Sequence, residues 1–405
     1  MATKVKKHKL PRVKLHPATL KHAKKGHPWV TEDSYTKEFP RKQNLLIGKN
    51  PKGDEKLFLL HDPTHKKVKA RIWEIGTELP ESPNGFLRSF NHRLEESFLK
   101  RVSAREKYQR DNFYLCFAEA DGIPGLMIQK FGNVALIQIY SDFWFFFKND
   151  IRRIVKAHCA SHFPEIDKFI FQQRKTSDTV NFENLEKKLT EITIQEFGIN
   201  YHLRFDYRYD IGIYSDMSAI RKKLTNEFRN AKSVLNLYSY TGAFSLFALS
   251  KGATDVHSVD LSKDYITWLE KNIELNPQLN SSHHESKITS VEKALKSYAD
   301  EGKKFDLIIC DPPSFSSDGR KSQSALKSYD KLIPMIESCL SDEGKAVVFL
   351  NTHHILRKKF NERIEQLASK SGMRVAKALR MEEDCVTLSG FPEGDYLKGL
   401  LLSRK

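Results

Sequence analysis

The sequence lacks the features that mark zinc-binding, disulfide-bonded and membrane proteins. Its cysteines are odd in number and never spaced as CxxC, so they predict neither a zinc site nor a disulfide framework. No apolar run reaches the roughly 18 residues that a membrane span needs, and the basic start has no apolar core typical of a secretory signal. We therefore expect a soluble cytoplasmic protein with reduced thiols, no metal and no membrane partner. The five cysteines are Cys116, Cys159, Cys310, Cys339 and Cys385.

The charge balance is strongly positive. Lysines and arginines number 67 against 51 aspartates and glutamates, which gives a formal net charge of +16. In a cytoplasmic protein the polyanion that matches such a charge is nucleic acid. The alternative is a merely basic, solvated surface. The sequence leaves the oligomeric state open.

The length of 405 residues predicts two or three domains. Short apolar segments separated by Gly, Pro, Asn and Asp indicate a small β-rich domain over residues 1–80. A basic linker helix and an α+β middle domain are expected over residues 81–205. In the first domain Trp29, within "GHPWV", suits either contact with an RNA backbone or a place in the core.

Residues 206–405 show a different rhythm, in which strand-like and helix-like segments alternate from about Lys232. This alternation predicts an α/β fold with a doubly wound, mostly parallel sheet. Ligands of such sheets bind at the carboxyl ends of the strands. We therefore expect the functional residues at strand ends.

The first two strands of this region carry a nucleoside-binding pattern. Gly242, in "YSYTGAF", allows a tight turn between strand and helix. Asp260 ends the next strand, 18 positions later, close to the ~20 typical of an acid that binds ribose hydroxyls. A complete GxGxxG is missing, which disfavours a dinucleotide. S-adenosylmethionine, which has a ribose and no phosphate, fits better.

The segment "ICDPPSFSS" ends a later strand with an acid and two prolines. Prolines remove two N–H donors and leave carbonyl groups outward, while Phe315 offers a face on which a flipped base can stack. A plain strand-ending turn is the alternative. Cys310 is either a nucleophile or core filler, and strand alternation favours filler because it turns Cys310 away from the face of Asp311.

Five motifs in order resemble one family: "SVLNLYSYTGAF", "DIGIYSDMSAIR", "ICDPPSFSS", "AVVFLN" and "FPEGDYLKG". They are similar to the bacterial 23S ribosomal RNA methyltransferases that carry an N-terminal PUA domain. "GHPWV" and "GIPGLMIQKFGN" extend the resemblance over nearly the whole chain. The resemblance implies a PUA-like RNA-binding domain, an α+β middle domain, a Rossmann-like class I methyltransferase domain, S-adenosylmethionine as cofactor and large-subunit ribosomal RNA as partner.

The resemblance also implies roles for individual residues. Two departures from the family pattern concern the cofactor: Met217 and Ser218 follow Asp216 where the family has a polar residue and Arg, and Ser290 stands where it has an acid, which Glu292 replaces only by a register shift. The implied cofactor contacts are Asp216, Tyr240, Thr241, Gly242 and Asp260. The implied residues beside the target base are Asp311, Pro312, Pro313, Ser314 and Phe315.

A third departure concerns the base. Methylation of cytosine at C5 needs an accessible, activated thiolate, and the family's C5 branch places this cysteine after the strand matching "AVVFL". Here the position is Asn351, as in a guanine-N7 branch that lacks the cysteine. Guanine N7 has an in-plane lone pair, so positioning alone can suffice. Guanine N7 is therefore the first choice of acceptor, an exocyclic amine the second and cytosine C5 the third.

Two rival functions stay open at this stage. A non-catalytic RNA-binding factor of ribosome assembly is motivated by Met217, Ser218 and Ser290. A nicotinamide-dependent oxidoreductase is disfavoured by the missing GxGxxG, and hydride transfer has no need of the Pro312-Pro313 pair.

Overall fold

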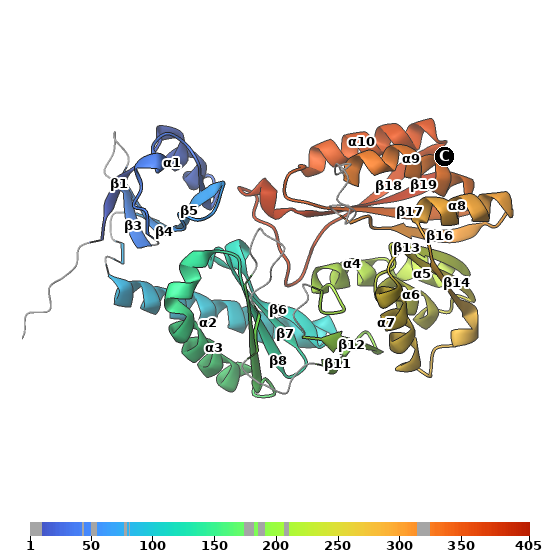
Figure 1. Ribbon diagram of the computed structural model, residues 1–405, viewed down its shortest axis with the longest axis horizontal. Helices are drawn as coiled ribbons and strands as arrows, with labels where there is room; N and C mark the ends of the chain where they lie inside the picture. Colours follow the sequence, from blue (N-terminus) through green and yellow to red (C-terminus); the bar gives the residue numbers. More distant parts are fainter. Residues whose placement is uncertain are drawn as a thin grey trace, which may run out of the picture. The chain divides into compact units, whose positions relative to one another are not determined.

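The computed structural model describes residues 10–42, 44–49, 55–76, 79–80, 82–173, 182–184, 191–205, 210–313 and 325–405. Contacts divide them into two compact units, each with its own core (Figure 1). Unit 1 holds the described residues up to Asn184 and, from late in the sequence, Asp384–Phe391. Unit 2 holds residues 191–205, Asp210–Glu383 and Pro392–Lys405. The predicted boundaries at residues 80 and 205 stay a prediction.

The first part of unit 1 is β-rich, as the sequence predicts. Five strands form one sheet in the order β1-β3-β4-β5-β2, antiparallel except where β1 meets β3. Leu20 of α1 packs with Leu46 and Leu59 in a small core on this sheet. The elements are β1 (Arg12–Lys14), α1 (Pro17–Lys24), β2 (Trp29–Thr31), η1 (Thr36–Glu38), β3 (Asn44–Lys49), β4 (Lys56–His61) and β5 (Val68–Gly76).

The second part of unit 1 is an α+β layer. Helix α2 (Pro83–Tyr108) begins where the Ser82 hydroxyl accepts the Gly85 N–H at 3.1 Å and Pro83 takes the first helical position. It packs beside α3 (Lys148–His162) on a sheet of order β10-β9-β8-β7-β6. The remaining elements are β6 (Asn112–Phe117), η2 (Ala118–Asp121), β7 (Leu126–Phe131), β8 (Val134–Ile139), η3 (Asp142–Phe147), β9 (Lys168–Gln173) and β10 (Phe182–Asn184).

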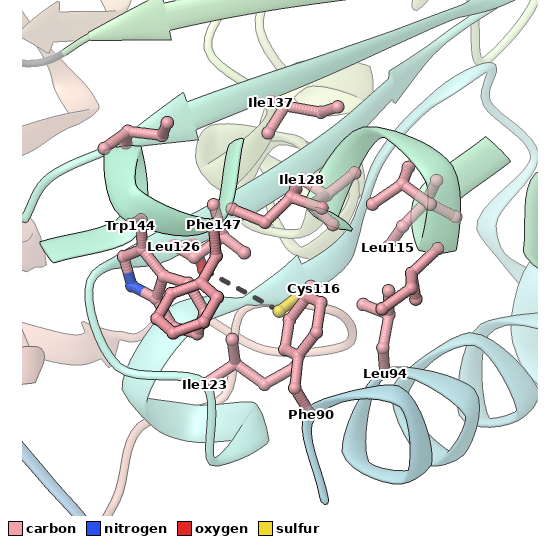
Figure 2. Packing of buried hydrophobic residues seen from close by; sticks show 14 of the residues in the cluster. Phe90, Leu94, Leu115, Cys116, Ile123, Leu126, Ile128, Ile137, Trp144 and Phe147 are labelled. Atoms are coloured by element: carbon pink, nitrogen blue, oxygen red, sulfur yellow. Dashed lines mark hydrogen bonds between the residues drawn. The ribbon is translucent and has the colours of Figure 1, made fainter. Parts of the chain in front are cut away.

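Figure 2 shows the core of this layer. Phe90 of α2 points toward Cys116 of β6, and its ring lies 5.3 Å from that of Trp144 of η3 between centroids, while Leu94 of α2 lies near Leu115. The Cys116 Sγ lies 3.7 Å from the carbonyl oxygen of Leu126, and burial raises the pKa of this thiol. Cys116 is therefore a protonated core residue.

Residues from the far end of the sequence complete unit 1. Trp29 donates its ring N–H to Glu119 at 2.9 Å, and its ring meets that of Phe391 at 4.5 Å between centroids. The Asp384 carboxylate accepts from Arg110 at 2.5 Å and from the Tyr114 N–H at 2.6 Å. Trp29 thus packs within unit 1. The segment Asp384–Phe391 is held in the same unit through Asp384 and Phe391.

Unit 2 is built on a seven-stranded sheet of order β15-β14-β13-β16-β17-β19-β18. Strands β13 to β17 run parallel, and β19 pairs antiparallel with both β17 and β18. The prediction of a doubly wound, mostly parallel sheet is confirmed. The strands are β13 (Ser233–Leu237), β14 (Asp255–Asp260), β15 (His284–Ile288), β16 (Phe305–Cys310), β17 (Leu340–Asn351), β18 (Met373–Leu379) and β19 (Leu397–Arg404).

Helices cover both faces of this sheet (Figure 1). Helices α8 to α10 pack on one face, and α4 to α7 lie with the hairpin β11-β12 on the other. None of the helices in the described part of the chain combines the length and apolar character that crossing a membrane requires. The elements are β11 (Glu191–Glu196), β12 (Ile199–Arg204), η4 (Ser215–Met217), α4 (Ser218–Lys223), α5 (Thr225–Asn230), α6 (Ala243–Ser250), α7 (Lys263–Glu274), η5 (Ser281–His283), α8 (Val291–Asp300), α9 (Ala325–Ser338), α10 (Arg357–Lys370) and η6 (Pro392–Gly394).

The substitution Asp384→Ala should destabilise unit 1 by about 3–5 kcal/mol, because it leaves a fully buried Arg110 without its counter-ion. Urea unfolding followed by tryptophan fluorescence measures this, since Trp29, Trp73 and Trp144 lie in unit 1 and Trp268 in unit 2. The matched control is Asp150→Ala, which breaks an exposed pair with Arg153 and should cost less than about 1 kcal/mol. Equal effects of the two substitutions would contradict this role of Asp384.

Candidate active site

The direction in which the chain adds strands to the sheet of unit 2 reverses at β13. The chain first adds β14 and β15 on one side of β13 and then places β16 on the other. In open α/β sheets this switch point is where ligands bind, outside the carboxyl ends of the strands. We call the edge at which β13, β14, β16 and β17 end the carboxyl edge.

The loop that follows β13 has an unusual backbone. Tyr238 and Tyr240 have positive φ angles of 56° and 50°, and Gly242 has a φ of 85°. Such conformations cost non-glycine residues about 1–3 kcal/mol and persist where the surroundings over-determine them, often at ligand sites. A Cβ atom on Gly242 would lie 2.5 Å from Cγ of Leu269. The tight turn predicted at Gly242 is therefore present.

Asp260 holds this loop against the end of β14. One carboxylate oxygen accepts the Tyr240 N–H at 3.0 Å, and the other accepts the Ser262 N–H at 2.9 Å. Each oxygen can accept more than one hydrogen bond, so the carboxylate still has acceptor capacity for ribose hydroxyls. Asp260 thus lies at the strand end where the sequence predicts it.

Tyr240 and Thr241 hold the segment before η4. The Tyr240 hydroxyl accepts the Gly212 N–H at 2.9 Å, and the Thr241 hydroxyl donates to the Gly212 carbonyl oxygen. The side chain of Thr241 is fully buried. Both residues therefore orient the segment that leads to Asp216, a task that sequence reasoning did not predict for them.

Asp216 is held by a residue 180 positions away. The Tyr396 hydroxyl donates to the Asp216 carboxylate at 2.7 Å. Next to Tyr396, the buried Lys398 donates to the carbonyl oxygens of Thr352 at 2.6 Å and Tyr396 at 3.0 Å, and burial lowers the pKa of Lys398 to about 8. Tyr396 and Lys398 lie in the quoted motif "FPEGDYLKG", but no spacing rule links them to Asp216.

Asp311 directly follows β16 and is partly buried. Burial raises the pKa of its carboxyl to about 7, and the nearby charge of Asp216 adds to the effect. Pro312 is buried and Pro313 exposed, as a turn that leaves the sheet requires. Phe315 and Ser314 lie outside the described residues.

Cys310 has the character of a core residue. Its side chain is fully buried, and burial raises the pKa of its thiol. The prediction that Cys310 is core filler is confirmed. All five cysteines of the chain are buried.

Asn351 is the last residue of β17 and pairs with Leu397 of β19. It is partly buried, at the same edge as Asp311. Here β17 and β16 run parallel, so the ends of the two strands lie at one side of the sheet. The structure therefore places Asn351 and Asp311 on neighbouring strand ends.

The residues that depart from the family pattern have structural partners. Ser218 donates to the buried Glu196, which also binds Arg221 at 2.6 Å. Met217 is buried. The Ser290 hydroxyl accepts the Lys293 N–H at 3.3 Å and so caps α8. These side chains stabilise the fold around the carboxyl edge.

Exposed apolar residues at the same edge were not predicted. Leu261, directly after Asp260, is 71% exposed, and Ile288, the last residue of β15, is 52% exposed. Large apolar side chains that are exposed near a ligand site can pack against a flat apolar ring of the ligand. The sequence signal that could have identified Leu261 is its position directly after Asp260, the acid that ends β14.

Comparison with protein families and curated proteins gives consistent results. The sequence model described as S-adenosylmethionine-dependent methyltransferase matches residues 151–393. Ribosomal RNA large subunit methyltransferase I of Shewanella amazonensis is 27% identical over 413 residues, covering 96% of this chain and 98% of that protein. YwbD of Bacillus subtilis, provisionally named a ribosomal RNA large subunit methyltransferase, is 30% identical over 325 residues, covering 78% and 80%.

Two solved structures share the fold over nearly all of both chains. SMU.776, a provisionally assigned methyltransferase complexed with SAH, matches with a TM-score of 0.84 at 21% identity, covering 97% of this chain and 100% of that one. A provisionally assigned S-adenosylmethionine-dependent methyltransferase from Streptococcus mutans matches with a TM-score of 0.83 at 21% identity and the same coverage. At this identity the likeness shows the fold.

Replacing Gly242 by Ala should destabilise unit 2 more than replacing Gly252 by Ala. Both glycines have positive φ, but a Cβ at Gly242 would collide with Leu269, whereas nothing lies within 4 Å of one at Gly252. The difference should be about 1–3 kcal/mol, the usual cost of overpacking. Urea denaturation followed by circular dichroism measures it. Equal stabilities would show that the Gly242 turn tolerates a side chain.

Proposed function

Because the chain belongs to the S-adenosylmethionine-dependent methyltransferases, we propose that it methylates a base of large-subunit ribosomal RNA and that the acceptor is guanine N7. The relatives named for large-subunit ribosomal RNA support the substrate, since one of them matches along 96% of this chain. The observation that carries the choice of atom is the absence of an accessible thiol: all five cysteines are buried.

The residues of the carboxyl edge fit the cofactor. Asp260 would accept from the ribose hydroxyls, Leu261 and Ile288 would flank the adenine ring, and the Tyr238–Gly242 loop would border the ribose. When bound, S-adenosylmethionine supplies a methyl group on a positively charged sulfur. Asp216 and Asp311 would then provide the negative charge that favours a cation at this edge.

The choice of the methyl-accepting atom depends on which side chains lie at the carboxyl edge. Attack by cytosine C5 requires prior addition of a thiolate to the ring, and Cys310 is buried and protonated. Guanine N7 attacks through its own lone pair and needs only orientation in line with the methyl group. Asn351, on the strand end next to Asp311, would hold the base through its amide.

Unit 1 carries features suited to RNA. Lys148, Arg152 and Lys156 follow one another at helical spacing on α3, and their cationic groups lie 5.9, 5.5 and 5.2 Å from the rings of β9 phenylalanines. Phe146, just before this row, is 77% exposed. A basic row beside an exposed aromatic ring matches the pattern by which proteins bind a phosphate backbone and stack a base.

Deleting the gene should remove one 7-methylguanosine from large-subunit ribosomal RNA, as measured by mass-spectrometric nucleoside mapping. A plasmid copy with Cys310→Ala should restore the modification, because Cys310 does not react. A copy with Asn351→Ala should restore it roughly 10- to 100-fold less efficiently, because the base loses its orienting amide.

Other outcomes of the mapping identify the alternatives. Loss of 5-methylcytidine, together with covalent trapping on 5-fluorocytidine RNA that Cys310→Ala abolishes, would overturn the N7 assignment. Loss of an N2-methylguanosine would move the acceptor to the exocyclic amine. An unchanged nucleoside pattern with no binding of S-adenosylmethionine would leave a non-catalytic RNA-binding factor.

Binding of S-adenosylmethionine should strengthen about tenfold between pH 6 and pH 8, as the Asp311 carboxyl with its pKa of about 7 ionises and attracts the sulfonium. Calorimetry measures this, with S-adenosylhomocysteine as the matched ligand. The latter lacks the positive charge but keeps every other group, so its affinity should change little. Asp311→Asn should abolish the difference in pH dependence between the two ligands. Equal pH dependence of both ligands in the unsubstituted protein would contradict a role for Asp311.

A further inference from the structure

Helices α2 and α3 of unit 1 each present a pair of polar side chains one turn apart. Asn91 and Glu95 are four residues apart on α2, and His158 and His162 are four residues apart on α3. This spacing places both members of a pair on one face of their helix. Because α2 and α3 pack together, the two pairs meet.

The contacts among these side chains are close. The Glu95 carboxylate lies 2.5 Å from His158 Nδ1 and 3.0 Å from His162 Nε2. One ligand atom from each of the three residues falls within 4.8 Å of the others. Two ligands of a tetrahedral zinc ion lie about 3.3 Å apart, since each is about 2.0–2.1 Å from the metal. The two observed separations, 2.5 and 3.0 Å, are shorter, so an ion would move the Glu95 carboxylate away from both rings by less than 1 Å.

The second ring nitrogen of His158 is also engaged. His158 Nε2 lies 3.1 Å from the Asn91 side-chain oxygen. His158 Nδ1 lies at hydrogen-bond distance from the Glu95 carboxylate, so an ion would take the place of the Nδ1 proton and leave Nε2 to donate to Asn91. A ligating histidine in metal sites typically donates its other N–H to such an oxygen, which fixes the tautomer.

We propose that Glu95, His158 and His162 bind one divalent transition-metal ion, with zinc as the ion that fits best. Two imidazole nitrogens and one carboxylate oxygen form the three-ligand set that zinc accepts with water in the fourth position. Ca²⁺ and Mg²⁺ prefer sets made of oxygens alone. The side chains of Glu95 and His162 are 35% and 17% exposed, so ion and water have access.

The surroundings hold the ligands in place. The ring of Phe98 packs against both imidazoles, at 5.6 Å from His158 and 6.4 Å from His162 between centroids. The two imidazoles are stacked with an interplanar angle of 13°. A bound ion would join α2 to α3 and stabilise unit 1. This role is independent of methyl transfer, which we assign to unit 2.

The test uses the full-length protein stripped of metal with a chelator. Titration with Zn²⁺ by calorimetry, and with Co²⁺ by visible absorption, should show one ion bound per chain at this site, and Zn²⁺ should raise the melting temperature. Glu95→Gln and His162→Gln should each weaken binding at least about tenfold and remove the stabilisation by Zn²⁺. Asn91→Ala should weaken binding about tenfold and no more than the loss of a ligand does, because it removes only the orienting partner of His158.

The matched controls are His92→Gln and Glu96→Gln. His92 and Glu96 form an exposed pair on α2, 3.6 Å apart, and offer the same kinds of group without a third ligand. Their substitution should leave the affinity unchanged. The proposal is overturned if the protein binds neither ion, or if Glu95→Gln and His162→Gln bind as tightly as the unsubstituted protein while circular dichroism shows all of them folded.

Discussion

The carboxylate of Asp260 is the interaction on which the candidate active site depends. It accepts the N–H groups of Tyr240 and Ser262, so it joins the loop after β13 to the loop after β14. Hydrogen bonds to an ionised acceptor are stronger than neutral ones, which offsets the positive φ of Tyr240. With this loop held, Tyr240 and Thr241 bind Gly212 and thereby orient the segment that carries Asp216.

Charge is divided within the molecule in a way that suits its family. The chain as a whole carries a net charge of +16, yet the carboxyl edge of unit 2 gathers Asp216, Asp260 and Asp311. Acidic groups at this edge favour a cationic cofactor, and burial together with the nearby charge of Asp216 raises the pKa of Asp311 to about 7. The basic remainder favours a polyanionic substrate. One chain can therefore attract two ligands of opposite charge.

Much of the candidate site was predictable because it lies at strand ends. Gly242, Asp260, Asp311 and Asn351 each lie at the end of a strand or in the loop after it, and parallel strands bring their carboxyl ends to one edge. The burial of Cys310 followed from strand alternation in the same way. The hydrogen bonds of Tyr240 and Thr241 with Gly212 were not predictable, since Gly212 lies 28 and 29 positions away with no periodic relation to them.

The sequence by itself determined the sheet of unit 2, the strand ends that carry its acids and the lack of a cysteine after β17, because these depend on local periodicity and residue type. Only the tertiary structure decided that Tyr396 binds Asp216, that Asp384–Phe391 completes unit 1, and that Glu95 meets two histidines of α3. These contacts join segments up to hundreds of residues apart. They arise from the packing of whole elements, which no local pattern encodes.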